Sequence, residues 1–168
     1  KPESKFTAIR QRLTPEQFRE RCGAEPALFT WSTGVSLLVA RAAIEKLGFH
    51  RDDYWIRGED LEYSLRLTCN GKGVLVPTAI TRHLPPPAVG NVDLADERAK
   101  HAAMIRNAAF TSFRLRHGRS LIRRLPGNCL RFVRTWGFTP DTFKLLFASL
   151  WDGALRGLPA GADRAAER

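Results

Sequence analysis

Several side chains capable of chemistry lie between residues 31 and 83 of this 168-residue chain. Glu59 and Asp60 stand at the expected start of a helix, where free amide groups and the helix dipole favour ionised carboxylates. A carboxylate in that position is a candidate general base if a substrate hydroxyl can reach it. Acids in a first helical turn are also common without a catalytic role, because they complement the dipole. The pair by itself favours this second, non-catalytic interpretation.

One histidine and three aromatic residues complete the set of candidates. His83 lies at the end of an expected strand, just before Pro85-Pro86-Pro87. Its imidazole could bind a metal ion or a diphosphate, or it could hydrogen-bond to a neighbouring loop. Trp31, Tyr54 and Trp55 have flat faces that can stack on sugar rings, and they are equally suited to a hydrophobic core.

The elements expected to position these residues form a mixed α/β pattern. Residues 29–39 are rich in β-branched and aromatic side chains and predict a buried strand. Gly34 inside it indicates close approach by another backbone or by a ligand. Residues 40–47 predict a helix, and a second helix begins near Gly58. Residues 74–76 predict the start of a short strand, which Pro77 either breaks or places at the edge of a sheet. We therefore expect an α/β fold for the first half of the chain.

The second half is expected to be helical. Asp93 is a good N-cap for a helix that runs to about His117. A basic segment, residues 120–133, is expected to break at Pro126-Gly127, and Thr139-Pro140 predicts the start of a last helix. The predicted division is residues 1–84, a helical extension over residues 91–157, and a disordered tail over residues 158–168.

The net charge of +10 is concentrated in one segment. Residues 98–134 contain ten Lys and Arg and no acid, so the rest of the chain is neutral. A solvated helical face, nucleic-acid binding and attachment to an anionic membrane surface are the three interpretations. No zinc-finger, RNA-recognition or glycine-hinge motif supports nucleic acid, although a plain helix-turn-helix stays open. Membrane attachment is favoured because arginines alternate there with nine apolar residues: Phe110, Phe113, Leu115, Leu121, Ile122, Leu125, Leu130, Phe132 and Val133.

The composition further limits which classes of protein this chain can belong to. The fractions of hydrophobic (43%) and charged (26%) residues are typical of a globular protein. No stretch of about 18 uncharged apolar residues predicts a membrane-spanning helix. Three distant cysteines, Cys22, Cys69 and Cys129, form neither a disulfide framework nor a zinc pattern and favour a reducing compartment.

Taken in order, the motifs resemble the C-terminal half of a family-two glycosyltransferase catalytic domain, which has the GT-A (Rossmann-like) fold. Bacterial galactofuranosyl- and rhamnosyltransferases are the most similar subgroup. The resemblance covers about residues 29–157. It is carried by Gly34, the Leu47-Gly48-Phe49 turn, the acidic segment 55–66, Gly73, Pro77, His83, Arg106-Asn107, Arg116-His117-Gly118 and the segment 152–157.

This resemblance implies an inverting reaction in which an acceptor hydroxyl displaces a nucleoside diphosphate from a sugar. Asp60 would be the base, and Glu59 would orient or contact the acceptor. Trp31, Tyr54 and Trp55 would line the acceptor side, whereas Gly34 would let the backbone approach the nucleotide-sugar donor. The acceptor would be a glycan of the cell envelope or a lipid-linked glycan.

The resemblance also implies a divalent cation that neutralises the leaving diphosphate, with His83 as a ligand. An imidazole ligand favours Mn²⁺ slightly over Mg²⁺. The family's Asp-x-Asp metal motif occurs nowhere in the 168 residues. The chain is therefore expected to be a fragment, inactive without a donor-binding half, and peripheral on the inner face of a bacterial plasma membrane. The alternative is a basic, non-enzymatic module that binds nucleic acid or an anionic membrane.

Overall fold

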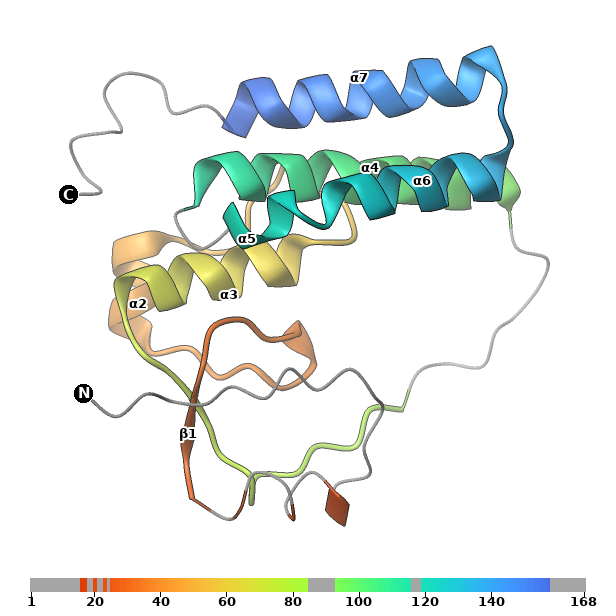
Figure 1. Ribbon diagram of the computed structural model, residues 1–168. Helices are drawn as coiled ribbons and strands as arrows, with labels where there is room; N and C mark the ends of the chain where they lie inside the picture. Colours follow the sequence, from red (N-terminus) through yellow and green to blue (C-terminus); the bar gives the residue numbers. More distant parts are fainter. Residues whose placement is uncertain are drawn as a thin grey trace.

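Two short strands and a set of helices make up the protein in the computed structural model, which describes residues 25–84, 93–115 and 119–157, together with residues 16, 17, 20 and 23. The elements of the first half are β1 (Ala27–Phe29), the 3₁₀ turn η1 (Gly34–Ser36), α2 (Arg41–Leu47), α3 (Glu59–Asn70) and β2 (Gly73–Leu75). Those of the second half are α4 (Leu94–Arg114), α5 (Arg119–Ile122), α6 (Leu125–Trp136) and α7 (Pro140–Gly157). Figure 1 shows α4, α6 and α7 stacked above α3, with the strands at the opposite end.

The expected α/β fold is wrong for the described residues. Their only sheet is the antiparallel pair of β1 and β2, with Leu28 opposite Val74, and helices dominate the rest. A GT-A or Rossmann-like domain needs a larger, mainly parallel sheet with helices on its faces. The described residues contain no such sheet.

The strand predicted over residues 29–39 is shorter than expected, because its backbone bonds to polar side chains of α3 instead of to a neighbouring strand. Only its first residue belongs to β1, and Gly34–Ser36 turns into η1. The Thr68 hydroxyl donates to the Thr30 carbonyl, and the Ser32 amide donates to Ser64 Oγ. Ser and Thr side chains offer the backbone such local alternatives to strand pairing. The segment is therefore attached to α3 rather than to a neighbouring strand.

The helix predictions are mostly confirmed. Asp93 caps α4 by accepting a hydrogen bond from the Ala95 amide at 2.9 Å, and α7 begins at Pro140 as expected. The expected break at Pro126-Gly127 is wrong, because both residues lie in the first turn of α6. Proline is tolerated there, since first-turn amides have no partner within the helix. The predicted tail over residues 158–168 lies outside the described residues.

Two apolar clusters hold the helices together. Ile105 of α4, Phe132 of α6 and Leu146 of α7 form the centre of the larger cluster. Leu65 of α3 packs with Leu115 and Leu121 in the smaller one, so α3 is joined to the helical half. None of the helices within the described ranges is both long enough and apolar enough to cross a membrane.

Candidate functional site

The two predicted acids lie in the first turn of α3. Gly58 precedes them with φ of 111°, a left-handed conformation that glycine adopts without strain, and its carbonyl accepts the Glu62 amide. Glu59 and Asp60 therefore stand at the positive end of the helix dipole. Their predicted position at a helix start is confirmed.

Asp60 lies in a small cluster with Gly34 and His50. Its side chain is 38% exposed, and its Oδ1 lies 3.7 Å from His50 Nε2. A Cβ at Gly34 would lie 2.5 Å from Asp60 Oδ1, so only glycine permits this approach. The sequence predicted close approach to Gly34 by a backbone or a ligand, whereas the neighbour in the structure is the Asp60 side chain.

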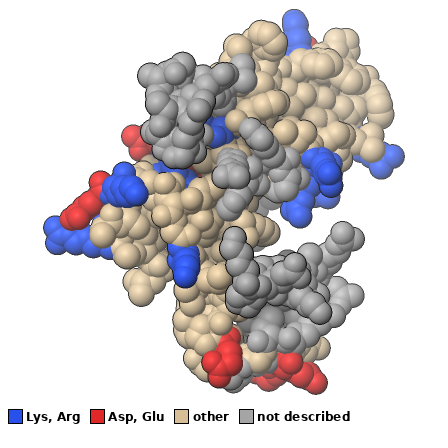
Figure 2. All heavy atoms as spheres, turned by 60° about the vertical axis from the view of Figure 1, so that its left-hand side comes forward, with Lys and Arg blue, Asp and Glu red and all other residues tan. Residues whose placement is uncertain are grey.

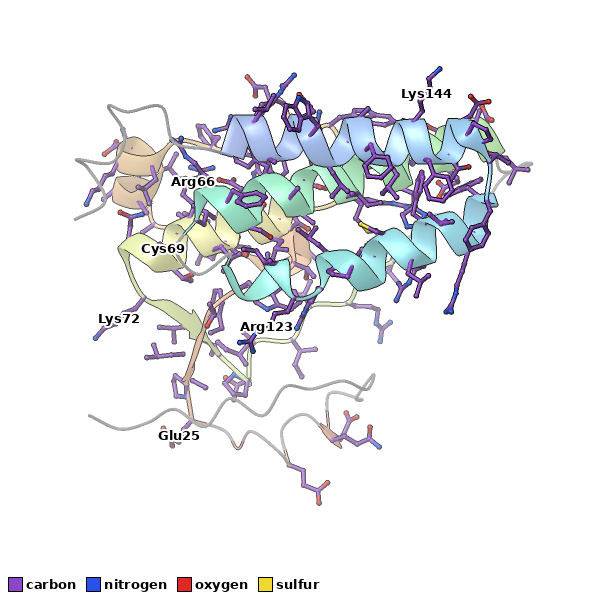
Figure 3. All side chains as sticks on the ribbon, turned by 45° about the horizontal axis from the view of Figure 1, so that its top comes forward. Glu25, Arg66, Cys69, Lys72, Arg123 and Lys144 are labelled. Carbon is purple, nitrogen blue, oxygen red and sulfur yellow. The ribbon has the colours of Figure 1, made fainter. Side chains whose placement is uncertain are left out.

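His50 was not among the residues singled out from the sequence. Its ring packs against Tyr63 of α3 with the centroids 4.1 Å apart. Arg66 holds the preceding chain by donating hydrogen bonds to the Leu47 and Phe49 carbonyls, and it also pairs with Glu62. Figure 3 labels this arginine on α3. No local pattern around His50 indicates this pairing, which depends on how the loop folds back onto α3.

Glu59 differs from Asp60 in its surroundings. Its Oε2 atom is buried and has no hydrogen-bond partner among the described residues. A buried carboxylate oxygen without a partner is costly, and such groups are often found where a ligand or water completes the site. Because this oxygen is buried, a bound hydroxyl does not reach it in this arrangement, and the predicted contact of Glu59 with an acceptor stays a prediction.

The three aromatic residues predicted to bind an acceptor differ in their exposure to solvent. Trp31 and Trp55 are 50% and 60% exposed and can present a ring face to a ligand. Tyr54 is buried, donates to the Asn107 carbonyl and shares a 2.6 Å hydrogen bond with Thr111. Burial raises the pKa of Tyr54 above its ordinary value. Its predicted acceptor-binding role is not supported by this position, which makes it part of the core.

Helix α4 positions the loop that leads into the acids. Asn107 donates from its amide nitrogen to the Ile56 and Arg57 carbonyls, at 3.1 and 2.9 Å. Arg106 donates to the Asp53 carbonyl and to the Asn107 side-chain oxygen. The geometry of the α3 N-terminus thus depends on two residues about 50 positions later in the chain.

His83 is exposed and lies in the segment after β2. That segment is held near η1, because Thr81 Oγ1 lies 2.9 Å from Ser36 Oγ. Within the described ranges, no group of three or more His, Cys, Asp or Glu side chains is arranged to hold a metal ion. These residues do not form a cation site around His83, so the predicted Mn²⁺ or Mg²⁺ rests on the resemblance alone.

The basic segment is only partly free to bind a partner. Lys100 pairs with Asp96 and Glu97, and Arg106 is engaged as described above. Four arginines are exposed and form no ion pair with any residue that the structure describes: Arg123, Arg124, Arg131 and Arg134. Figure 3 shows Arg123 beside the turn between α5 and α6. Five of the nine apolar residues expected at a membrane surface are buried in the core instead: Phe110, Leu115, Leu121, Phe132 and Val133.

Comparisons with known proteins add no relative. No family model, no curated protein and no solved structure matches this chain. The motifs in the sequence and the geometry around Asp60 are therefore the basis for assigning a function.

Proposed function

We propose that this chain supplies the catalytic base and part of the acceptor site of an inverting glycosyltransferase. The observation that carries the proposal is the Asp60 carboxylate, partly open at the start of α3 and held between Gly34 and His50. The resemblance noted above supplies the reaction class and the galactofuranose or rhamnose type of donor. Binding of the nucleotide-sugar is assigned to residues outside these 168, because the chain contains no Asp-x-Asp motif.

In this reaction the acceptor hydroxyl gives its proton to the Asp60 carboxylate as its oxygen attacks the anomeric carbon. The bond from that carbon to the diphosphate oxygen breaks on the opposite face, and the configuration inverts. Glu59 orients or contacts the acceptor, a role that rests on the resemblance alone.

The exposed tryptophans supply the saccharide contacts. Trp31 precedes Ser32, whose amide is tied to Ser64 of α3, and Trp55 lies three residues before Gly58. Both therefore come from segments attached to the N-terminal half of α3. Ring stacking of this kind suits a glycan of the cell envelope or a lipid-linked glycan.

Calorimetric titration with rhamnosyl and galactofuranosyl oligosaccharides tests the acceptor site. Trp31→Ala and Trp55→Ala are each expected to weaken binding about 10-fold, which corresponds to about 1.4 kcal/mol. Trp151→Ala is the matched control, because Trp151 is similarly exposed but lies on α7. Equal losses in all three variants, or no saccharide binding by the wild type, would contradict the proposal.

The catalytic role is tested in a preparation that includes the donor-binding residues. Asp60→Asn is expected to lower transfer by at least about 100-fold, because the amide cannot take the proton, while donor binding is retained. The 168-residue chain alone is expected to transfer no sugar from UDP-galactofuranose or dTDP-rhamnose. Transfer by that chain would overturn the assignment of donor binding to other residues.

A second candidate function, docking on an anionic membrane, rests on the four exposed arginines around α5 and α6. Each cation close to such a surface contributes about 1 kcal/mol. Sedimentation with phosphatidylglycerol vesicles is expected to decrease in Arg131→Gln/Arg134→Gln and to persist in Arg82→Gln, which changes an exposed arginine outside this group. Tight duplex DNA binding at matched salt, without a preference for anionic lipid, would favour the nucleic-acid alternative.

A further inference from the structure

A polar pocket lies beside the Asp60 cluster, and none of the functions above uses it. Its volume is about 480 Å³, within the range of small-molecule sites. The C-terminal end of α2, the loop that follows it and α3 enclose the pocket. His50 lines it and also lies 3.7 Å from Asp60, measured from Nε2 to Oδ1. One side chain therefore borders both the pocket and the proposed base.

Arg66 of α3 holds one wall of the pocket in place. Its side chain is only 17% exposed, and its Nε donates to Glu62 Oε1 at 2.8 Å. The same guanidinium donates to the carbonyls of Leu47 and Phe49, which lie on the opposite wall, and Figure 3 shows its place on α3. The pocket is therefore formed before a ligand binds, which lowers the ordering cost of binding.

The charges that line the pocket are balanced. Arg51 donates from Nε and Nη2 to the two carboxylate oxygens of Asp53, at 2.9 and 3.0 Å. Hydrogen bonding to Arg51 holds the pKa of Asp53 below its ordinary value, so this carboxylate stays ionised. Asp52 is exposed and forms no hydrogen bond or ion pair with any residue that the structure describes. Because Arg66 also has a carboxylate partner, both guanidinium groups are compensated, and the free carboxylate of Asp52 would repel an anion.

The surrounding surface does not favour an anion either. In Figure 2 the side of the molecule that carries α2 comes forward, and its Lys and Arg side chains are separated by uncharged surface, with acids beside some of them. A cleft attracts an anionic substrate when positive charge alone lines it. The described residues around this pocket do not form such a lining, so its electrostatics suit a neutral ligand.

The groups of the pocket that are free to bind suit a polyhydroxylated ring. Phe49 is 72% exposed and presents an apolar face that can pack against the C–H groups of a sugar. The Asp52 carboxylate accepts hydrogen bonds and donates none, and two neighbouring sugar hydroxyls are matched donors. An apolar ring face beside a charged acceptor is therefore complementary to a neutral saccharide.

We propose that this pocket is a saccharide subsite, which holds the unit of the acceptor glycan next to the unit whose hydroxyl reacts at Asp60. The inference rests on the proposed function, because Asp60 fixes where the reacting hydroxyl lies. Phe49 packs against the ring of the bound unit, and Asp52 accepts hydrogen bonds from its hydroxyls. The subsite adds to the contacts assigned to Trp31 and Trp55, which do not line this pocket.

NMR titration of the isotope-labelled 168-residue chain with rhamnosyl and galactofuranosyl oligosaccharides tests the subsite. The amide resonances of residues 49–53 are expected to shift. Phe49→Ala and Asp52→Asn are each expected to raise the dissociation constant at least about 5-fold, because one loses a ring contact and the other a charge-assisted hydrogen bond. Phe138→Ala and Glu25→Gln are the matched controls, because Phe138 is 74% exposed, Glu25 is exposed, and neither lines the pocket. Circular dichroism verifies that each variant is folded.

The outcomes separate this subsite from the proposed function. If the two pocket variants bind like their controls while Trp31→Ala and Trp55→Ala weaken binding, the subsite is wrong and the acceptor site stands. If the pocket variants weaken binding but Asp60→Asn retains transfer, the pocket binds a saccharide and the catalytic role of Asp60 is wrong. Inorganic phosphate should leave the amides of residues 49–53 unshifted. A saturable shift with phosphate, and none with the oligosaccharides, would overturn the subsite in favour of an anion site.

Discussion

Helices α4 and α7 approach each other closely at Gly153, and adding one methyl group there should be costly. A Cβ at Gly153 would lie 2.9 Å from Ala109 Cβ and 3.0 Å from the Arg106 carbonyl carbon, and closer still to that carbonyl's oxygen. The obstacle is mainly backbone in the middle of a 21-residue helix, which cannot rotate away as a side chain can. Gly153→Ala must therefore push α4 and α7 apart.

The size of the effect follows from two opposing contributions. Overpacking a closely packed site costs about 1–3 kcal/mol, and a backbone obstacle places Gly153→Ala near the upper limit. Replacing glycine by alanine inside a helix contributes about 1 kcal/mol in the other direction. The expected net loss is about 2 kcal/mol in the free energy of unfolding. For a chain of this length, that loss lowers Tm by about 4–8 °C.

Gly127→Ala is the matched control for this prediction. Gly127 lies in the first turn of α6, and a Cβ there would meet nothing within 4 Å. The substitution should raise Tm by about 2–4 °C, because only helix propensity changes, by about 1 kcal/mol. Scanning calorimetry and urea unfolding measure both variants. If Gly153→Ala is as stable as Gly127→Ala, the described packing of α4 on α7 is wrong.

Three further perturbations address the site and its support. Gly34→Ala should displace the Asp60 carboxylate, shifting its carboxyl carbon resonance in NMR and weakening transfer, while Tm changes by less than about 2 °C, because a side-chain end can move aside. Asn107→Ala removes the amide that holds two loop carbonyls and should cost about 2 kcal/mol, measured by urea unfolding. Burial lowers the pKa of the His101 imidazole in the folded chain. As the pH drops below about 6.5, the unfolded chain therefore binds a proton at this residue before the folded chain does, and the free energy of unfolding should decrease. His101→Gln should remove that part of the pH dependence measured by thermal unfolding.

Each of these has an outcome that would contradict it. An unshifted Asp60 resonance in Gly34→Ala would mean that the carboxylate does not contact residue 34. Asn70→Ala is the control for Asn107→Ala, because it loses only an exposed hydrogen bond within α3 and should cost less than about 0.5 kcal/mol. If Asn107→Ala lowers the free energy of unfolding by no more than this control, Asn107 does not anchor the loop. Unchanged pH dependence in His101→Gln would assign the titration to another group.

The sequence determined the features that depend on neighbouring residues. Asp93 caps α4 because its side chain accepts a hydrogen bond from an amide of the first turn. Pro140 begins α7 because the amides of the first turn have no partner within the helix, so the missing N–H of proline is not needed there. Glu59 and Asp60 could be placed at a helix start for the same reason. Local backbone chemistry is sufficient for such predictions.

Tertiary structure alone decided which side chains meet. Tyr54 and Trp55 are adjacent and chemically similar, yet the first is buried against α4 and the second is exposed. The strand expected over residues 29–39 was shortened by hydrogen bonds to α3, whose residues follow more than 30 positions later. Contacts between distant segments determine burial and partner choice, and local pattern does not contain that information. The contact of His50 with Asp60 likewise depends on the packing of the loop on α3.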